Sequence, residues 1–421
     1  MTRRTKTYRL AAVAAASVLV LAACGGGDDD SSGNDDSASP SQSDGVLTVG
    51  SLLPQTGSLA FLGPPEFAGV DLAIAEINEA GGVLGQDVVG VKADSGDTDS
   101  GIAPAETDKL LDADADVIVG AASSGVSMTV VEKIMSAGVV MFSPANTSTA
   151  FDEGDFAEPD LYFRTAPSDI LQGAVMSNLL LEDGKQNVAI LARQDAYGET
   201  LAEEIKKGLE NAGSTVAATV FYGENAQSYD SQVQQIADSA PDAVVLVAFE
   251  ETTTIVPQLV SAGVGPQDVS TYFVDGNTAD YSGKLPDGTL TGTKGTIPGA
   301  EATGDFRQRL LAIDPTLTDF TYSAESYDAT IVSALAAIAA DSDAGDKISE
   351  EIPGVTEGGT KCTTFAECRD LLEAGEDIDY DGVSGPIELG ETGSPTAASI
   401  GIYQYGADNK ITPVKYIPGQ I

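Results

Sequence analysis

Apolar, β-rich runs alternate with helical patterns along most of this chain, and that alternation restricts the fold more than any other feature. The apolar runs cover residues 46–53, 88–93, 116–120, 139–143, 187–191, 215–222, 243–249 and 270–274. The helical patterns between them cover residues 67–79, 129–137, 171–182, 201–212 and 254–262. Strands alternating with helices indicate parallel sheets with helices on both faces. About nine strands over this length favour two such sheets rather than one.

The loops that follow the predicted strands are the first place to look for a ligand site. Ligands of open parallel sheets bind beyond the carboxyl ends of the strands. Six such loops, at 54–63, 120–127, 143–149, 193–199, 249–254 and 275–278, are rich in Ser, Thr, Gly, Asn or aromatic residues. Any one of them is typical of an ordinary turn. Six together predict a rim of hydrogen-bonding side chains without acid–base catalysts.

The counts of acidic, basic and histidine residues argue against several classes of function for this chain. The chain has 65 Asp and Glu against 21 Lys and Arg, a formal net charge of −44, and no His. Such a surface repels nucleic acid, so no nucleic-acid partner is expected. Without His, a Ser-His-Asp or Cys-His nucleophile cannot be built from this chain, and the commonest ligand of catalytic zinc is absent. We therefore expect no enzyme, no cofactor and no metal site.

The first 24 residues have the pattern of a bacterial lipoprotein signal. A basic start is followed by an apolar run over 10–22, which is too short to span a bilayer comfortably, and then by Leu21-Ala22-Ala23-Cys24. We expect residues 1–23 to be a signal peptide, Cys24 to carry the lipid, and residues 24–45 to be a disordered tether. This predicts a protein anchored at the extracytoplasmic face of the cell membrane. The alternative is an ordinary signal peptide with an unrelated cysteine.

The two remaining cysteines, Cys362 and Cys368, lie six positions apart. In an oxidising compartment this spacing favours one short disulfide, which would contribute about 2 kcal/mol. Two thiols without His or further Cys do not suit a zinc site.

Several short segments occur along the chain in a specific order and spacing. They are Ser51-Leu52-Leu53-Pro54-Gln55-Thr56-Gly57, Ile77-Asn78-Glu79-Ala80-Gly81-Gly82-Val83-Leu84-Gly85, Phe142-Ser143-Pro144-Ala145-Asn146-Thr147, Phe163-Arg164-Thr165, Asp195-Ala196-Tyr197-Gly198, Val274-Asp275-Gly276 and Ser384-Gly385-Pro386. In this order they resemble segments of the periplasmic branched-chain amino-acid-binding proteins, and the resemblance covers nearly all of residues 46–421.

This resemblance implies the type I periplasmic binding fold, an α/β architecture with two doubly wound parallel-sheet lobes. Three hinge strands would join the lobes near residues 164–168, 293–298 and 383–387. The amino-terminal lobe would be 46–165 plus 297–384, and the carboxy-terminal lobe 166–295 plus 386–421. The implied function is that of a solute-binding lipoprotein of an ABC importer, a monomer whose lobes close on a neutral or branched-chain amino acid before it docks on a membrane permease.

Family correspondence also implies roles for residues in the first half of the chain. Ser124 would meet the ligand α-carboxylate through its hydroxyl and N–H, which suits its place between a strand and a helix. The alternative is that Ser124 only caps that helix. Ala145 and Thr147 would hold the ammonium and carboxylate, unless they simply form a turn with Pro144. Asn146 replaces the smaller residue expected there.

The other ligand contacts that the resemblance implies come from both halves of the chain. Asp275 would pair with the ligand ammonium, which favours an amino acid over urea, an amide or an aromatic acid; it could instead cap a turn. Tyr197 would cover the ligand from the opposite lobe, or merely pack between the lobes. The apolar end of the pocket would be shaped by Phe61, Leu62 and Phe249.

Other functions remain open at this point. The same two lobes could report a ligand to a membrane partner as a sensor, or bind an amide, urea or aromatic acid. An extracytoplasmic enzyme is the third alternative, and the missing His and missing nucleophile motif count against it.

Overall fold

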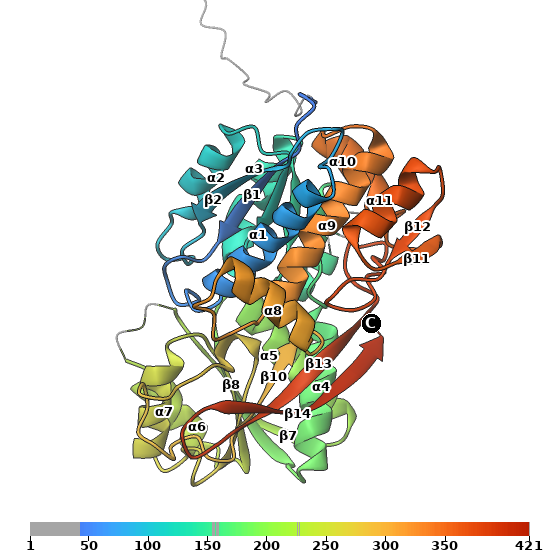
Figure 1. Cartoon of the computed structure of the whole chain (residues 1–421). Helices are drawn as coiled ribbons and strands as arrows, with labels where there is room; N and C mark the ends of the chain where they lie inside the picture. Colours follow the sequence, from blue (N-terminus) through green and yellow to red (C-terminus); the bar gives the residue numbers. More distant parts are fainter. Residues whose placement is uncertain (1–42, 154–155, 157–159, 225, 227, 421) are drawn as a thin grey trace, which may run out of the picture. The chain divides into compact units, whose positions relative to one another are not determined.

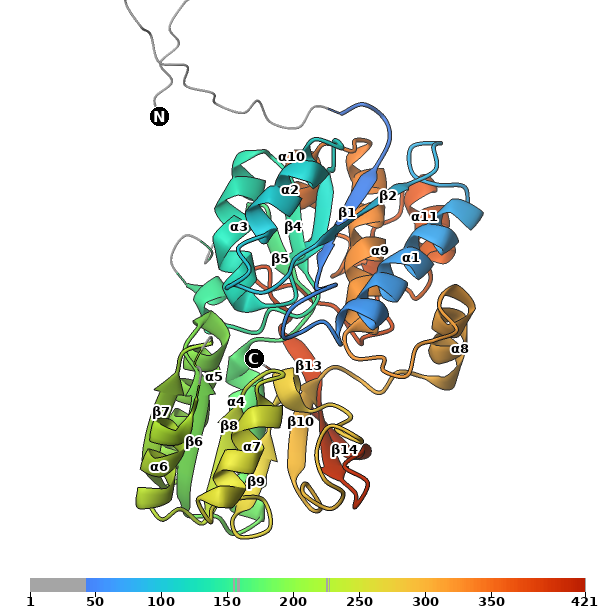
Figure 2. The same cartoon turned by 90° about the vertical axis from the view of Figure 1, so that its left-hand side faces the viewer.

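The five parallel strands of the first sheet come from the start of the folded chain. We describe a computed structural model covering residues 43–153, 156, 160–224, 226 and 228–420. The strands are β1 (Thr48–Leu53), β2 (Val89–Asp94), β3 (Val117–Gly120), β4 (Val140–Ser143) and β5 (Tyr162–Arg164), in the order β2-β1-β3-β4-β5. All pairings are parallel; Gly50 of β1, for example, lies between Val91 and Ile118. Every carboxyl end therefore meets one edge of this sheet (Figures 1 and 2).

The second sheet has seven strands and a mixed direction. Its strands are β6 (Asn187–Arg193), β7 (Thr215–Tyr222), β8 (Ala243–Val247), β9 (Ser270–Phe273), β10 (Lys294–Pro298), β13 (Ala397–Tyr405) and β14 (Ile411–Gln420), in the order β14-β13-β10-β9-β8-β6-β7. From β7 to β10 the pairings are parallel, whereas β13 and β14 pair antiparallel. The short strands β11 (Thr360–Cys362) and β12 (Ile378–Tyr380) form a separate parallel pair.

Eleven α-helices occur in the described residues, and most follow a strand directly. They are α1 (Gly63–Glu79), α2 (Ala103–Leu111), α3 (Ser124–Ser136), α4 (Asp169–Glu182), α5 (Ala196–Asn211), α6 (Asp230–Asp238), α7 (Thr252–Ser261), α8 (Gly304–Ile313), α9 (Ser323–Ala340), α10 (Gly345–Glu351) and α11 (Phe365–Glu373). Among the described residues, the 3-10 turns Thr149–Asp152 and Asp275–Asn277 lie in the loops that follow β4 and β9. Both loops start from the carboxyl end of a strand.

The chain passes between the two sheets three times. It leaves the first sheet after β5 and builds β6 to β10. After β10 it adds α8 to α11, whose apolar side chains share one hydrophobic core with α1 and the first sheet. It then returns to the second sheet as β13 and β14. Figure 2 shows α1, α9 and α11 beside the strands of the first sheet.

Close packing of α1 against α9 depends on one glycine. A Cβ on Gly69 would lie 2.3 Å from the backbone oxygen of Ser323, so any side chain there would push the helices apart. In Figure 1 the two helices run next to each other. Helix α9 is buried on nearly every face from Ser323 to Ala337, which makes it the central helix of this half of the structure.

These features confirm the predicted α/β architecture with two parallel-sheet layers, with the addition that the second sheet ends in two antiparallel strands. The predicted strands agree with β1 to β4 and β6 to β9 within about two residues. The predicted disulfide between Cys362 and Cys368 is present. In the described part of the chain no helix is long and apolar enough to cross a membrane. The predicted signal peptide, Cys24 and most of the tether lie outside the described residues.

Two carboxyl groups are buried where α1 meets α9. Glu66 of α1 is fully buried, and neither of its carboxylate oxygens has a hydrogen-bond partner among the described residues. Glu325 of α9 is 4% exposed. Burial raises the pKa of Glu325 to about 8, with nearby Asp328 adding to the rise. Burial, and to a lesser extent Glu325, also raises the pKa of Glu66 well above its usual range. Both groups therefore favour the protonated form in the folded protein.

This burial predicts that the protein becomes more stable when the pH falls from 8 to 6. A carboxyl whose folded pKa is raised binds its proton more tightly in the folded state, so its stabilisation is complete at low pH and is lost as the pH rises through the folded pKa. For Glu325, the change between pH 8 and pH 6 is about 2 kcal/mol. Chemical denaturation at both pH values measures this change, and Glu325→Gln should flatten the pH slope.

The control for that experiment is Glu203→Gln, because the Glu203 side chain is 62% exposed and pairs only with Lys206 on the helix surface. This variant should keep the wild-type slope. A slope that is equally steep in Glu325→Gln and Glu203→Gln would contradict the assignment to the buried carboxyl.

Candidate functional site

A small cavity lies where strand ends of the two sheets face each other. Its volume is about 10 Å³, roughly the space of one water molecule. The residues around it come from loops after β1, β3, β4, β6, β8 and β9 and from the start of α9. They are Leu62, Ala122, Ser123, Ser124, Ala145, Tyr197, Phe249, Asp275 and Tyr322. Six of the eight ligand-binding residues predicted from the sequence line this one cavity.

The turn from β3 into α3 brings backbone N–H groups to the cavity. Gly120 ends β3 with φ 137°, and a Cβ there would lie 2.1 Å from the Leu52 backbone oxygen, so glycine is required. The peptide bond between Gly120 and Ala121 is cis. Ser123, rather than Ser124, caps the helix by accepting a hydrogen bond from the Val126 N–H. The proposed capping role of Ser124 is therefore taken by its neighbour.

Ser124 is the first residue of α3, and it is 2% exposed. Its hydroxyl oxygen accepts a hydrogen bond from the Ser148 N–H at 3.4 Å. The hydroxyl and the free N–H groups of the first helical turn lie at the positive end of the helix dipole. This side of the cavity suits a negatively charged group.

The loop after β4 contains Ala145, Asn146 and Thr147, and only Ala145 lines the cavity. The Asn146 side-chain amide instead donates to the Ala121 and Ala122 carbonyls at 3.0 Å, and its oxygen accepts from Tyr162. Asn146 therefore stabilises the β3–α3 turn through hydrogen bonds to its backbone, and it does not line the cavity.

Thr147 is buried but does not line the cavity either. Its backbone carbonyl accepts a hydrogen bond from the Asp169 N–H at 2.7 Å. Its hydroxyl has no hydrogen-bond partner among the described residues. A ligand contact from this hydroxyl would require the loop to shift.

Three residues of the second sheet form the opposite wall. Tyr197 lies in the first turn of α5, Phe249 follows β8, and Asp275 follows β9. The rings of Tyr197 and Phe249 stack with centroids 5.4 Å apart and planes 19° apart. The Tyr197 hydroxyl donates to Asp275 Oδ1 at 2.6 Å. The wall thus combines an aromatic face with a single carboxylate.

Two further partners of Asp275 were not anticipated from the sequence. Gln172 of α4 donates to Asp275 Oδ1 at 2.9 Å. Tyr322, just before α9, donates to Asp275 Oδ2 at 2.8 Å. Tyr322 has a left-handed backbone, with φ 57°, which is uncommon for an aromatic residue. Through Tyr322, the half of the structure built on the first sheet reaches across the cavity to the acid on the other side.

Burial controls the protonation of this cluster. Desolvation raises the pKa of the Asp275 carboxyl, while hydrogen bonds from Tyr197, Gln172 and Tyr322 oppose that rise. Burial and the adjacent Asp275 raise the pKa values of the Tyr197 and Tyr322 phenols well above their usual range. Both phenols therefore remain protonated donors. The side chains that hydrogen-bond to the Asp275 carboxylate are neutral, and it forms no ion pair with a described residue.

A second hydrogen bond joins the two walls near the cavity. The Ser148 hydroxyl, after β4, donates to the Ala196 backbone carbonyl at the start of α5 at 2.8 Å. The Thr200 hydroxyl donates to the Asp169 carboxylate at 2.7 Å. Burial raises the pKa of Asp169 to about 7.

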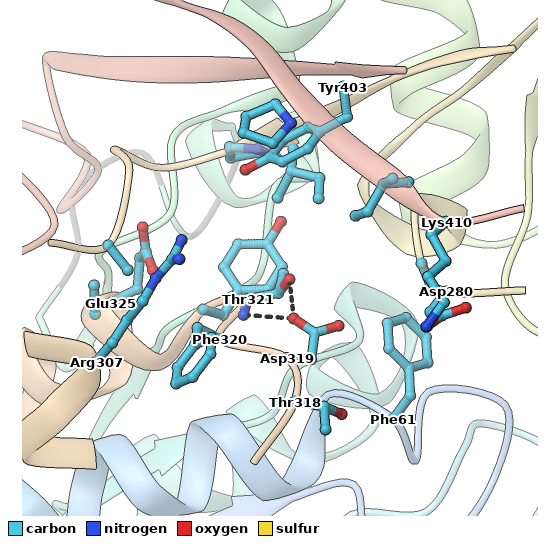
Figure 3. Close-up of a pocket in the computed structure, with 18 of the residues that line it drawn as sticks. Phe61, Asp280, Arg307, Thr318, Asp319, Phe320, Thr321, Glu325, Tyr403 and Lys410 are labelled. Carbon is cyan, nitrogen blue, oxygen red and sulfur yellow. Dashed lines mark hydrogen bonds and ion pairs between the residues drawn. The ribbon is translucent and has the colours of Figure 1, made fainter. Parts of the chain in front are cut away.

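Phe61 faces a different space, a cleft of about 760 Å³ that also borders Tyr322. Figure 3 shows Phe61 on one side of this cleft, with Asp280 and Lys410 near it and Tyr403 across. Arg307 and Glu325 lie at the far end of the same view. The cleft is lined by both acidic and basic side chains, whereas Asp275 is the one charged residue in the lining of the cavity. Of the predicted apolar contacts, Leu62 and Phe249 line the cavity and Phe61 does not.

The cavity can therefore hold opposite charges at its two ends. The α3 end offers a hydroxyl and free N–H groups, and the Asp275 end offers a buried carboxylate. Among the described residues there is no group of three His, Cys, Asp or Glu side chains placed to hold a metal ion. The arrangement is suited to binding a small zwitterion.

Comparison with known proteins agrees with this fold. The sequence model for periplasmic binding proteins matches residues 46–410. The chain is 28% identical over 359 residues to BasB, a chemotactic signal transduction substrate-binding protein of Halobacterium salinarum, covering 82% of this chain and 83% of that protein. It is 29% identical over 254 residues to a leucine-, isoleucine-, valine-, threonine- and alanine-binding protein of Pseudomonas aeruginosa, covering 58% and 66%.

Solved structures with the same fold bind different ligands. The leucine-binding protein LivK of Thermotoga maritima superposes with a TM-score of 0.72 at 20% identity, covering 88% of this chain and 99% of that one. A solute-binding protein of R. palustris in complex with benzoate superposes with a TM-score of 0.70 at 17% identity, covering 90% and 98%.

Proposed function

Since this chain belongs to the periplasmic binding protein family, and is a solute-binding protein of the ABC-transporter type, we propose that it binds a small amino acid between two closing lobes and delivers it to an importer. The first sheet with α1 to α3 and α8 to α11 would form one lobe, and the second sheet the other. We further propose that a lipid on Cys24 holds the monomeric protein at the extracytoplasmic face, where it docks on the membrane permease.

One observation carries the choice of an amino acid: the buried Asp275 carboxylate and Ser124 line the same small cavity from opposite walls. A ligand ammonium would supply the cation that Asp275 lacks, and the ligand carboxylate would accept hydrogen bonds at the start of α3. Benzoate or another aromatic acid has no ammonium, so its binding would leave the buried carboxylate unpaired or place a second anion near it. Among ligands of related structures, amino acids therefore fit best.

The size of the cavity means that binding requires the two walls to move apart. With a volume of about 10 Å³, the cavity has room for one water molecule but not for an amino acid. The walls are held together near the cavity by Tyr322 on Asp275 and by Ser148 on Ala196. Separation would break these hydrogen bonds, and a ligand would replace them with its own.

The proposal is tested by melting the protein with a panel of ligands. Leucine, isoleucine, valine, alanine, threonine, urea and benzoate are each added at millimolar concentration. At least one neutral amino acid should raise the melting temperature by several degrees, because a ligand at 100 times its Kd stabilises the native state by about 2.7 kcal/mol. Shifts only with benzoate, or only with urea, would overturn the assignment of an amino-acid ligand.

A sensor is the second candidate, and its support is the resemblance to BasB, which is a substrate-binding protein of a chemotactic system. The same closed lobes would then present their surface to a signalling partner instead of a permease. Uptake of radiolabelled ligand by cells with and without the gene separates these functions. Transport requires uptake to fall when the gene is deleted, whereas a sensor leaves uptake unchanged.

A further inference from the structure

Arg193 is a buried cation that does not itself line the cavity. It is the last residue of β6, and its side chain is 2% exposed. Its guanidinium forms ion pairs with three carboxylates: Asp195 at 2.6 Å, Glu224 at 2.9 Å and Glu251 at 3.0 Å. These acids follow β6, β7 and β8, which are neighbours in the sheet. One side chain thus ties together three loops at the same sheet edge.

The same guanidinium lies flat against an aromatic residue of the cavity wall. Its central carbon is 3.5 Å from the centroid of the Phe249 ring. The Phe249 ring stacks on Tyr197, whose hydroxyl donates to Asp275. A continuous series of contacts therefore leads from Arg193 through two rings to the carboxylate that faces the cavity.

The ion pairs fix where the guanidinium can lie. Each carboxylate meets a different nitrogen of the planar group: Asp195 meets Nε, Glu224 one terminal nitrogen and Glu251 the other. Asp195 is itself held by the Gly198 N–H, and Glu251 by the Tyr222 hydroxyl. With its edge fully engaged, the guanidinium can offer only its face to Phe249. A lysine ammonium has neither this planar edge nor this face.

We propose that Arg193 is a positioning residue that fixes the aromatic wall of the cavity and thereby sets which ligand side chains fit. This inference rests on the proposed amino-acid-binding function. With Arg193 in place, Phe249 and Tyr197 hold one stacked arrangement, and once the two walls have moved apart this fixed wall favours compact aliphatic side chains. Without the flat cation, Phe249 can tilt, so the wall becomes looser and discrimination against larger side chains falls.

A double-mutant cycle tests this inference by calorimetry on the full chain. Arg193→Lys keeps the positive charge and removes the flat face. We expect it to weaken binding of the best neutral amino acid about 10-fold, the scale of a desolvated cation–π contact, and to reduce the preference for that amino acid over phenylalanine. In the Phe249→Leu background, the same Arg193→Lys change should alter affinity by less than about 2-fold, because the ring through which it acts is gone.

The matched control is Arg309→Lys. Arg309 also pairs with a carboxylate, Glu76, and lies over the rings of Phe306 and Tyr327, but it lies on α8, away from the cavity. It should leave affinity and preference unchanged. Equal losses for Arg193→Lys with and without Phe249, or no loss at all, would overturn the proposal.

If Arg193→Lys does not fold, Glu251→Gln takes its place in the cycle, because it removes one of the three ion pairs and keeps the guanidinium stacked on Phe249. Its smaller loss, about 3-fold, should also vanish in the Phe249→Leu background.

A ligand-free measurement separates failure of this inference from failure of the proposed function. The chain contains no Trp, so Phe249→Trp introduces a single indole at the stack, which can be excited at wavelengths where the Tyr residues do not absorb. Adding Arg193→Lys, or Glu251→Gln where that variant is used, should shift its emission to longer wavelength, because the indole loses its closely held position. If no amino acid binds but the emission shifts, Arg193 still positions the wall and the ligand assignment is wrong. If the emission does not shift, Arg193 does not act on the wall.

Discussion

Replacing Asp275 with asparagine should weaken amino-acid binding by at least about 100-fold, which corresponds to about 3 kcal/mol. The carboxylate is 5% exposed, and its hydrogen-bond partners are the neutral side chains Tyr197, Gln172 and Tyr322. A ligand ammonium placed there would therefore have Asp275 as its counter-charge. Asparagine keeps the size of the side chain but removes the charge, so a buried cation would be left unpaired. Calorimetric titration of the variant measures the loss.

The pH dependence of binding gives a second readout for the same residue. Burial raises the pKa of Asp275, so the carboxyl gains a proton at a higher pH than an ordinary aspartate does. Affinity for the amino acid should accordingly fall on acidification, and it should fall less in Asp275→Asn.

The control variant is Asp280→Asn. Asp280 lies five positions further on, its side chain is 53% exposed, and it pairs with Lys410 at the surface. Affinity should be unchanged in Asp280→Asn. If Asp275→Asn bound the amino acid as tightly as the wild type, Asp275 would not be the ammonium partner.

Replacing Arg164 with methionine should have the largest effect on stability, a loss of about 3–5 kcal/mol. Arg164 ends β5 and is fully buried. Its guanidinium donates to Asp152 at 2.6 Å, to the Ser394 hydroxyl at 2.8 Å and to the Ser148 carbonyl at 2.8 Å. It joins the end of the first sheet, the loop after β4 and the segment that leads into β13.

Methionine fills similar space but leaves the Asp152 carboxylate and the Ser148 carbonyl without their cation and donor. Chemical denaturation should show the loss of stability, and Arg164→Lys should recover only part of it, because lysine cannot reach all three segments at once.

The control variant is Arg307→Met. Arg307 is exposed, has no ion pair with a described residue, and lies over the Phe320 ring with its central carbon 5.3 Å from the ring centroid, so its removal should change stability by less than about 1 kcal/mol. Similar losses for both variants would contradict the bridging role of Arg164.

The strands β1 to β4 and β6 to β9 could be predicted because their sequences are apolar and β-rich over four to eight residues. Helix α9 could not be predicted in the same way. It is buried on nearly every face from Ser323 to Ala337, so its sequence has no polar stripe and no 3.6-residue period. Strands β13 and β14 were missed for another reason: much of β14 is exposed, so its pattern is mixed.

The candidate site could be predicted only in part. The rule that ligands bind at carboxyl ends of parallel strands, combined with the family resemblance, led to Ser124, Ala145, Tyr197, Phe249 and Asp275, and all of these line one cavity. Their roles in ligand binding remain predictions. The pattern cannot resolve a shift of one residue, which is why Phe61 was grouped with Leu62 although it faces the larger cleft.

Tyr322 and Gln172 had no local sequence signal. Tyr322 reaches Asp275 from 47 positions along the chain, and Gln172 from 103 positions. Neither position lies in a loop after a predicted strand. Contacts between segments so far apart depend on how the sheets and helices pack. A local sequence pattern does not predict that packing.

The central claim is that one cavity holds both charged ends of an amino acid, and calorimetry with paired analogues tests it most directly. For leucine the analogues are 4-methylpentanoate, which lacks the ammonium, and 3-methylbutylamine, which lacks the carboxylate; other amino acids have equivalent pairs. The account predicts that the amino acid binds and that each analogue binds at least about 100-fold more weakly. Binding of the carboxylate analogue as tightly as the amino acid would contradict it.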